Sequence, residues 1–308
     1  MSSLCNVTTV EAQIQINSTV FHRVKMISMC VSCTLNVLLS VPLLLVLTRS
    51  PSLLRHAPFL LLSQLLLCDN FQQLIWTTKA VLLRWKEAIP VTQCLILCAA
   101  DQACSLVDLL LSTALAMDRF AAVKWPLYYE FYMCPRRKRA AVAAIWILSA
   151  VLISVALSIS LSTVEVNFPL TRCRPLILVP CVSATSALVL YCTVGTALLV
   201  PLCFLTILGS FCLLCWDMRA GLLCTNRAFV TLTLQVAQII LFSVPLVTDS
   251  YLIPASMHSD ALDIATTISY NLGVLLVPLV YGYRSRELQQ RIRRAAKSKV
   301  KEQSMPRT

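Results

Sequence analysis

The residues most able to do chemistry form a polar stripe along one apolar run of the chain. Counting back from Arg119 by 7, 11, 14 and 18 residues gives Ser112, Asp108, Ser105 and Asp101. At about 100° per residue, these offsets return close to one face of a helix. Two carboxylates and a guanidinium on one face of an apolar helix can bind a cation, exchange a proton or form ion pairs with neighbouring helices.

A further carboxylate, Asp69, lies deep in the preceding apolar run, where it could meet Asp108 across the interior. Two bare carboxylates would repel each other there, which favours a shared proton or a cation. Charges at membrane depth are costly when they face lipid, so they mark functional sites by default. The alternative interpretation is a structural pair between helices.

The composition indicates that a membrane must hold these elements. The chain of 308 residues is 58% hydrophobic and only 13% charged, with five glycines, which is too apolar for soluble domains. Its three histidines are far apart, so the sequence offers neither a metal cluster nor a histidine-based catalytic triad. We therefore expect no enzyme and no cofactor.

A bilayer core needs about 20 mostly apolar residues per helix, and seven stretches qualify. The sequence thus predicts an all-α membrane protein, a seven-helix bundle over residues 27–283, between an N-terminal tail at 1–26 and a cytoplasmic segment at 284–308. The expected spans are 27–48, 58–82, 92–117, 140–162, 184–214, 227–249 and 261–283.

Two features orient these spans with the N-terminus outside. The two glycosylation acceptors, Asn6 and Asn17, both fall in the N-terminal tail. With that orientation, most of the 26 Lys and Arg residues lie in inside segments, as the positive-inside rule requires. We expect a multi-pass plasma-membrane protein, whose net charge of +12 reflects orientation in the bilayer rather than nucleic-acid binding.

The tripeptide Asp118-Arg119-Phe120 resembles the Asp-Arg-Tyr motif of the rhodopsin-like G-protein-coupled receptors. Cys94 lies 25 residues before Arg119, which is the family's spacing for a disulfide cysteine. Other spans carry residues that resemble the family's markers: Asn36, Asp69, Trp146, Pro201, Pro245 and Pro278-Leu279-Val280-Tyr281. In this family, Asn36, Asp69 and Asp108 would form an interior polar network.

Within the family, the chain looks most like the odorant-receptor branch, particularly fish-type odorant-like receptors and their orphan relatives. Four stretches carry that resemblance: 54–59, 117–119 with 126–128, 227–229 and 281–284. Val277 replaces the usual Asn before Pro278, and Ser243 replaces the Trp two residues before Pro245. Both positions belong to the activation machinery, so these departures put ordinary switching in doubt.

The resemblance implies an inner face that couples to a heterotrimeric G protein. Asp118 would neutralise Arg119 at rest, and movement of the sixth span would free Arg119 for the G protein. The basic run 136–139 could dock the G protein or contact lipid headgroups, and residues 286–301 are expected to lie as an amphipathic helix on the inner leaflet. The expected coupling residues are Asp118, Arg119, Phe120, Pro126, Leu127 and Tyr281.

The resemblance also implies an outer face with a disulfide and a small-molecule site. Cys94 would pair with Cys173 or Cys181, and the polar, loop-like setting of Cys173 favours it. Asp101 occupies the position where amine-binding relatives hold a ligand ammonium, so we expect an amine or odorant ligand; alternatively, Asp101 pairs with a protein base or is protonated. The expected pocket residues are Asp101, Ser105, Thr193, Ala197, Thr266, Thr267 and Tyr270.

Other functional classes fit the sequence less well. A transporter would show repeats or broken helices in matching halves, and an intramembrane enzyme would need a nucleophile with a base. A receptor that signals without a ligand, or that acts only as an accessory subunit, is compatible with Val277 and Ser243. The sequence names no oligomer.

Overall fold

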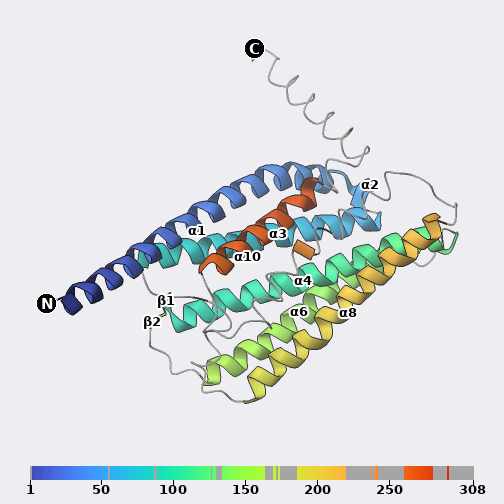
Figure 1. The fold of residues 1–308 in the computed structure, drawn as a ribbon. Coiled ribbons are helices and arrows are strands. Elements are labelled where there is room, and N and C mark those ends of the chain that lie inside the picture. Colours follow the sequence, from blue (N-terminus) through green and yellow to red (C-terminus); the bar gives the residue numbers. More distant parts are fainter. Residues whose placement is uncertain are drawn as a thin grey trace, which may run out of the picture.

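Long helices dominate the computed structural model (Figure 1). It describes residues 2–54, 56–86, 89–125, 127–129, 134–163, 169–170, 173, 186–219, 237, 240–241, 260–279 and 290. The helices are α1 (Ser2–Thr48), α2 (Pro51–Leu54), α3 (Ala57–Lys86), α4 (Val91–Lys124), α6 (Pro135–Thr163), α8 (Ser186–Arg219) and α10 (Asp260–Val277). Two short strands, β1 (Ile89–Pro90) and β2 (Pro169–Leu170), pair antiparallel.

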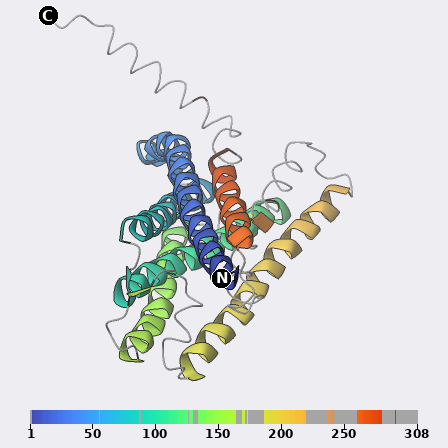
Figure 2. The same cartoon turned by 60° about the vertical axis from the view of Figure 1, so that its left-hand side comes forward.

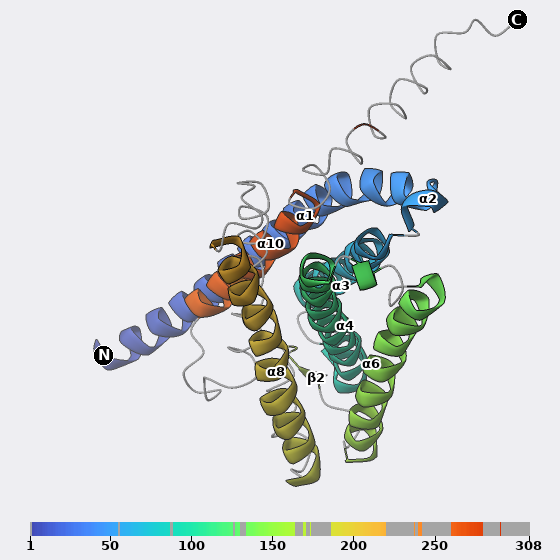
Figure 3. The same ribbon diagram turned by 90° about the vertical axis from the view of Figure 1, so that its right-hand side faces the viewer.

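Helix α4 is the centre of the bundle. It packs against α3, α6 and α8, while α1 packs against α3 and α10. Figure 3 shows α4 between α8 and α6, and Figures 2 and 3 show α10 running alongside α1. The helix that carries the polar stripe is therefore enclosed by other helices, as the cost of charge in lipid requires.

Six of the seven predicted spans coincide with helices in the described part of the chain. The predicted span 227–249 lies almost wholly outside the described residues. Four segments are long and apolar enough to cross a membrane, and α10 adds a shorter apolar segment, Ile264–Val277. Those four are Arg23–Thr48, Val91–Ala122, Pro135–Ser162 and Leu198–Trp216.

Large apolar side chains cover the outside of the bundle. Leu38 on α1, Ile147 on α6 and Leu198 on α8 are each more than 60% exposed, which a water-soluble protein would avoid over such an extended surface. A second apolar set, which includes Leu66, Leu111 and Val277, packs between the helices. A bilayer around the bundle explains why both surfaces are apolar.

Polar side chains join the helices across this apolar interior. The side-chain amide of Gln73 on α3 donates to Asn271 Oδ1 on α10 at 3.1 Å. The Trp146 indole on α6 donates to Gln64 Oε1 on α3 at 3.2 Å. Such bonds help to fix the register of neighbouring helices, because inside a membrane no water competes for their polar atoms.

Both ends of the chain leave predictions untested. Helix α1 includes the residues expected to form the N-terminal tail, but the side chains of Asn6 and Asn17 lie outside the described set. The expected amphipathic helix at 286–301 falls outside it as well, except for Gln290. Glycosylation and the inner-leaflet helix remain predictions.

Candidate functional site

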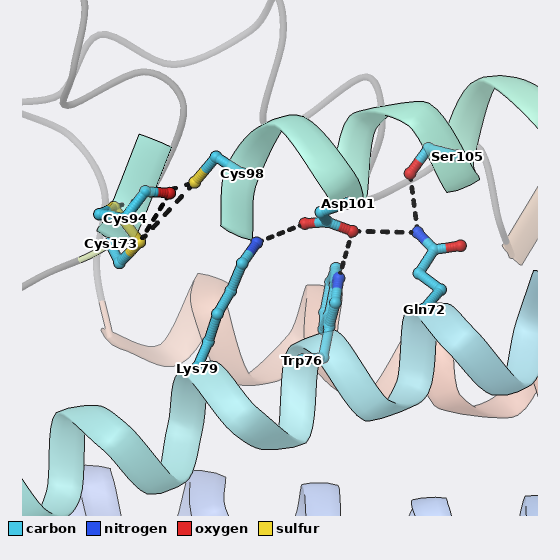
Figure 4. Close-up of polar contacts among 8 residues, drawn as sticks. All are labelled: Gln72, Trp76, Lys79, Cys94, Cys98, Asp101, Ser105 and Cys173. Carbon is cyan, nitrogen blue, oxygen red and sulfur yellow. Dashed lines mark hydrogen bonds and ion pairs between the residues drawn. A yellow bond between two sulfur atoms is a disulfide. The ribbon is translucent and has the colours of Figure 1, made fainter. Parts of the chain in front are cut away.

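Asp101 is the centre of a polar cluster between α3 and α4 (Figure 4). Its Oδ2 accepts from Lys79 Nζ at 2.7 Å, an ion pair whose side chains are 13% (Lys79) and 10% (Asp101) exposed. Its Oδ1 accepts from the Trp76 indole at 2.6 Å and from the Gln72 amide at 3.2 Å. Each carboxylate oxygen therefore has at least one donor, and one of the donors is a full positive charge.

The spacing of the cluster follows from helix geometry. Gln72, Trp76 and Lys79 are separated by four and three residues, so they lie on one face of α3. Asp101 and Ser105 are four residues apart on the facing side of α4, and the Gln72 amide bridges them with a second bond, of 2.7 Å, to Ser105 Oγ. Two regular helices thus bring five polar side chains together inside the bundle.

Helix α10 closes the cluster with an aromatic contact. The ring of Tyr270, which is only 2% exposed, stacks on Trp76 with centroids 4.3 Å apart and an interplanar angle of 16°. Thr266 and Thr267 are buried on the same helix. The side chains of Thr193 and Ala197, also expected in the pocket, lie outside the described set.

The two interpretations of Asp101 from sequence can now be separated. One assigned its carboxylate to a ligand ammonium, and the other to a protein base. The structure has the second arrangement, because Lys79 supplies the cation from within the chain. The sequence analysis missed Lys79, Trp76 and Gln72, although polar residues at helical spacing in an apolar span were the signal that could have found them.

A disulfide closes the same end of the bundle. Cys94 and Cys173 are bonded, with their Cα atoms 5.6 Å apart, which confirms the preference for Cys173 over Cys181. The β1–β2 pairing of Ile89 with Leu170 lies beside this bond in the sequence. Cys173, which follows β2, is thereby tied to the start of α4, next to the Asp101 cluster (Figure 4).

A third sulfur accompanies this disulfide. The Sγ atom of Cys98 lies 3.7 Å from that of Cys173 and 3.9 Å from that of Cys94. Three cysteine sulfurs this close can hold a soft metal only as thiolates. Because two of them form a disulfide, the group offers a single thiol and does not constitute a metal site.

A second acidic pair, Asp69 and Asp108, lies deeper in the bundle. Both side chains are 2% exposed, and they are close enough to interact electrostatically. Asp69 Oδ2 and both carboxylate oxygens of Asp108 have no hydrogen-bond partner within the described residues. Asn36, the third expected member of this network, instead accepts from Ser40 at 2.8 Å and donates to Asn70 Oδ1 at 3.5 Å.

The far end of α4 carries the Asp118-Arg119-Phe120 motif. Asp118 is buried, and its Oδ1 accepts from the Tyr129 hydroxyl at 2.6 Å. Burial and this bond raise the pKa of Tyr129 above its ordinary value, so the phenol remains a donor. The Phe120 ring packs edge-on against Trp125.

Within the described residues, no hydrogen bond or close ion pair joins Asp118 and Arg119, although the positive charge of Arg119 acts on the Asp118 carboxylate. Arg119 is exposed, and the hydrogen bond to Asp118 comes from Tyr129. Neighbouring residues on a helix point about 100° apart, so the two side chains do not readily face each other. Leu127 is 90% exposed, whereas Pro126 and Tyr281 lie outside the described residues.

These features agree with the result of a family comparison. The model of the 7 transmembrane receptor (rhodopsin family) matches residues 37–305. The chain belongs to this family. The match includes the predicted sixth span, so the seven-helix bundle and the multi-pass membrane character follow from it, and the protein is a receptor rather than an enzyme.

A curated relative narrows the comparison within the rhodopsin family. This receptor is 28% identical to Olfactory receptor 2AG2 of Homo sapiens over 257 residues, which cover 78% of each chain. The alignment is therefore long rather than confined to a motif. It agrees with the odorant-branch resemblance that the sequence showed at several separate stretches.

Proposed function

We propose that this rhodopsin-family receptor is of the odorant type and binds a small molecule beside the Asp101 cluster. The observation that carries this is the cluster itself, a group of polar and aromatic side chains from α3, α4 and α10 in an otherwise apolar bundle. Ligand sites combine apolar walls with a few oriented polar groups in this way. The odorant assignment draws on the similarity to an olfactory receptor.

The orientation that we propose puts this cluster on the extracellular side of the plasma membrane. A disulfide needs an oxidising compartment, and Cys94–Cys173 lies at the same end of α4 as Asp101. The distribution of basic residues and the positions of Asn6 and Asn17 support the same orientation. The Arg119 end of α4 would then face the cytoplasm.

In the proposed mechanism, Arg119 engages a heterotrimeric G protein when the receptor is active. The exposed guanidinium of Arg119 is available at the end of α4, while the buried carboxylate of Asp118 is held by Tyr129. A ligand that prefers the active arrangement of the helices would shift the population toward it. Leu127 and the basic run 136–139 supply further exposed surface at this end.

The test is a signalling assay in cells that express the wild type, Arg119→Ala or Lys86→Ala. Cyclic AMP and calcium are recorded across a panel of neutral odorants and small amines, with surface expression matched. Lys86 is an exposed base at the opposite end of the bundle, so its variant controls for loss of a positive charge. A wild-type response that Arg119→Ala abolishes and Lys86→Ala retains is the expected result.

Silence of all three proteins at matched surface expression would count against ligand-driven signalling. It would favour an accessory role, with which Val277 is compatible, because a buried valine occupies the position where the family usually has asparagine. Equal, ligand-independent signalling by the wild type and Lys86→Ala, lost in Arg119→Ala, would instead indicate constitutive activity.

A further inference from the structure

The Asp101 carboxylate is fully supplied with donors by the chain itself. Lys79 balances its charge at 2.7 Å, and Trp76 and Gln72 satisfy its other oxygen. Both charged side chains are about one-tenth exposed, so the pair lies where solvent screens charges poorly. No further positive charge is needed for electrical balance at this carboxylate.

A ligand ammonium would have to displace Lys79. A tethered group competes at an effective concentration on the order of millimolar or more, so a dilute amine meets a strong internal competitor. Adding a second cation without displacing the first would leave an uncompensated charge in the bundle, which is costly at membrane depth. The geometry therefore disfavours amines at the place where the sequence alone suggested them.

An uncharged ligand meets neither obstacle. The Gln72 side chain is 1% exposed, and its Oε1 has no hydrogen-bond partner within the described part of the chain. A hydroxyl group could satisfy that acceptor without disturbing the ion pair. The stacked rings of Trp76 and Tyr270 add an apolar aromatic surface to the same cluster.

We propose that Lys79 is a built-in cation that occupies the Asp101 carboxylate, so that the receptor selects neutral hydroxyl compounds over amines. The selection of ligands rests on the proposed receptor function, whereas the occupancy of Asp101 by Lys79 does not. Removing the Lys79 ammonium should convert the cluster into an amine site. Lys79 is then a specificity-determining residue that acts by exclusion.

The first experiment asks whether the vacated position accepts a free ammonium. Lys79→Ala removes the atoms of a propylammonium group from the side chain, so propylamine hydrochloride is the matching probe. Purified full-length receptor in detergent is melted with propylamine or propanol. We expect propylamine to raise the melting temperature of Lys79→Ala in a saturable way, and propanol to do so much less.

Three proteins control this experiment. The wild type should show no saturable stabilisation by propylamine, because Lys79 fills the position. Lys79→Ala/Asp101→Asn should also show none, because the attracting carboxylate is gone, and Lys86→Ala should behave as the wild type. Equal stabilisation of the wild type and Lys79→Ala, or none in Lys79→Ala, would overturn the proposal.

A second experiment tests ligand selection in cells and also covers failure of Lys79→Ala to fold. Lys79→Met keeps an apolar stem of similar length and removes the charge. The wild type and Lys79→Met are compared with phenylethanol and phenylethylamine, a neutral and a cationic compound of nearly the same shape. We expect the half-maximal concentration of phenylethylamine, divided by that of phenylethanol, to be at least about tenfold lower in Lys79→Met than in the wild type. This change is equivalent to about 1.4 kcal/mol.

The two experiments fail in distinguishable ways. If neither the wild type nor Lys79→Met signals, but propylamine stabilises Lys79→Ala, the proposed signalling function is refuted. The role of Lys79 as the internal cation then stands. Signalling by the wild type with an unchanged alcohol-to-amine ratio in Lys79→Met would refute the selection mechanism and keep the receptor function.

Discussion

Asp101 and Asp108 are the same residue type, seven positions apart on one face of α4, yet their surroundings are opposite. Asp101 faces Lys79, Trp76 and Gln72 of α3 and accepts three hydrogen bonds. Asp108 lies near another acid, Asp69, and has no hydrogen-bond partner within the described residues. The facing residues on α3 therefore decide what each carboxylate does.

The difference indicates that Asp101 forms a fixed structural ion pair, whereas Asp69 and Asp108 can bind a proton or a cation. A carboxylate that already has a cation and two further donors is fixed in place. A pair of buried carboxylates with so few donors favours a shared proton or a bound cation. Under our proposal, ligand selection belongs to the Asp101 cluster, and we expect Asp69 and Asp108 to respond to protons or cations.

The largest expected effect is the loss of the disulfide between Cys94 and Cys173, which lies at the same end of the bundle as the ion pair of Lys79 and Asp101. Cys94→Ser should lower the free energy of unfolding by about 4 kcal/mol, because the disulfide closes a loop with a sequence separation of 79 residues. Thermal melting of purified receptor measures this loss. Cys98→Ser is the matched control, and an equal loss in that variant would show that thiol packing, not the disulfide, dominates.

The next largest effect is expected from breaking the ion pair of Lys79 and Asp101. Asp101→Ala should cost about 3 kcal/mol, because it leaves the Lys79 ammonium without its carboxylate inside the bundle. Lys79→Met/Asp101→Leu should recover most of that loss, since no charge is then left uncompensated. The same melting assay in a double-mutant cycle checks both. Additive losses in the double variant would mean that the two side chains are not coupled.

A smaller change in the free energy of unfolding, of opposite sign, is expected at the acidic pair of Asp69 and Asp108. Asp108→Asn should raise the free energy of unfolding by about 1 kcal/mol, because it removes one of two neighbouring buried acids, whose mutual repulsion few donors offset. Asp101→Asn is the control and should lower it. If both substitutions destabilise to the same extent, the contrast between the two regions is wrong.

The smallest effect concerns a third carboxylate, Asp118, for which the described residues supply a single donor. Tyr129→Phe should lower the free energy of unfolding by about 1 kcal/mol, whereas Tyr128→Phe, at a 64% exposed position, should not. Because burial and the bond to Asp118 raise the pKa of Tyr129, the phenol stays protonated at alkaline pH where an exposed tyrosine ionises. Melting at neutral and mildly alkaline pH should therefore give the same difference.

The sequence predicted the fold well where hydrophobic length decides the outcome. Residues 92–117 and 140–162, for example, fall inside α4 and α6. The polar face of the third span was also predictable, because it depends on helical period. The family resemblance implied the disulfide of Cys94 and left Cys173 and Cys181 as partners, of which the polar setting favoured Cys173.

The partners of the polar residues could not be predicted in the same way. Which residue of α3 meets Asp101 depends on the relative height and rotation of the two helices, and a shift of α3 by one turn would put Trp76 where Lys79 lies. The contact between Asp118 and Tyr129 similarly depends on the path of the chain after α4. Helical period fixes the face of a residue but not the neighbour across it.

The ion pair between Lys79 and Asp101 has a consequence for biosynthesis. Helix α3 holds Asp69, Lys79 and three glutamines, and it is not among the described helices that are apolar enough to cross a membrane by composition. An unpaired Lys or Asp costs roughly 3 kcal/mol on insertion at the centre of a span and less toward its ends, where Lys79 lies. Neutralisation by α4 lowers that cost, so the two helices should leave the translocon as a hairpin, and a substitution of Lys79 or Asp101 should reduce the yield of inserted chains before it affects any mature receptor.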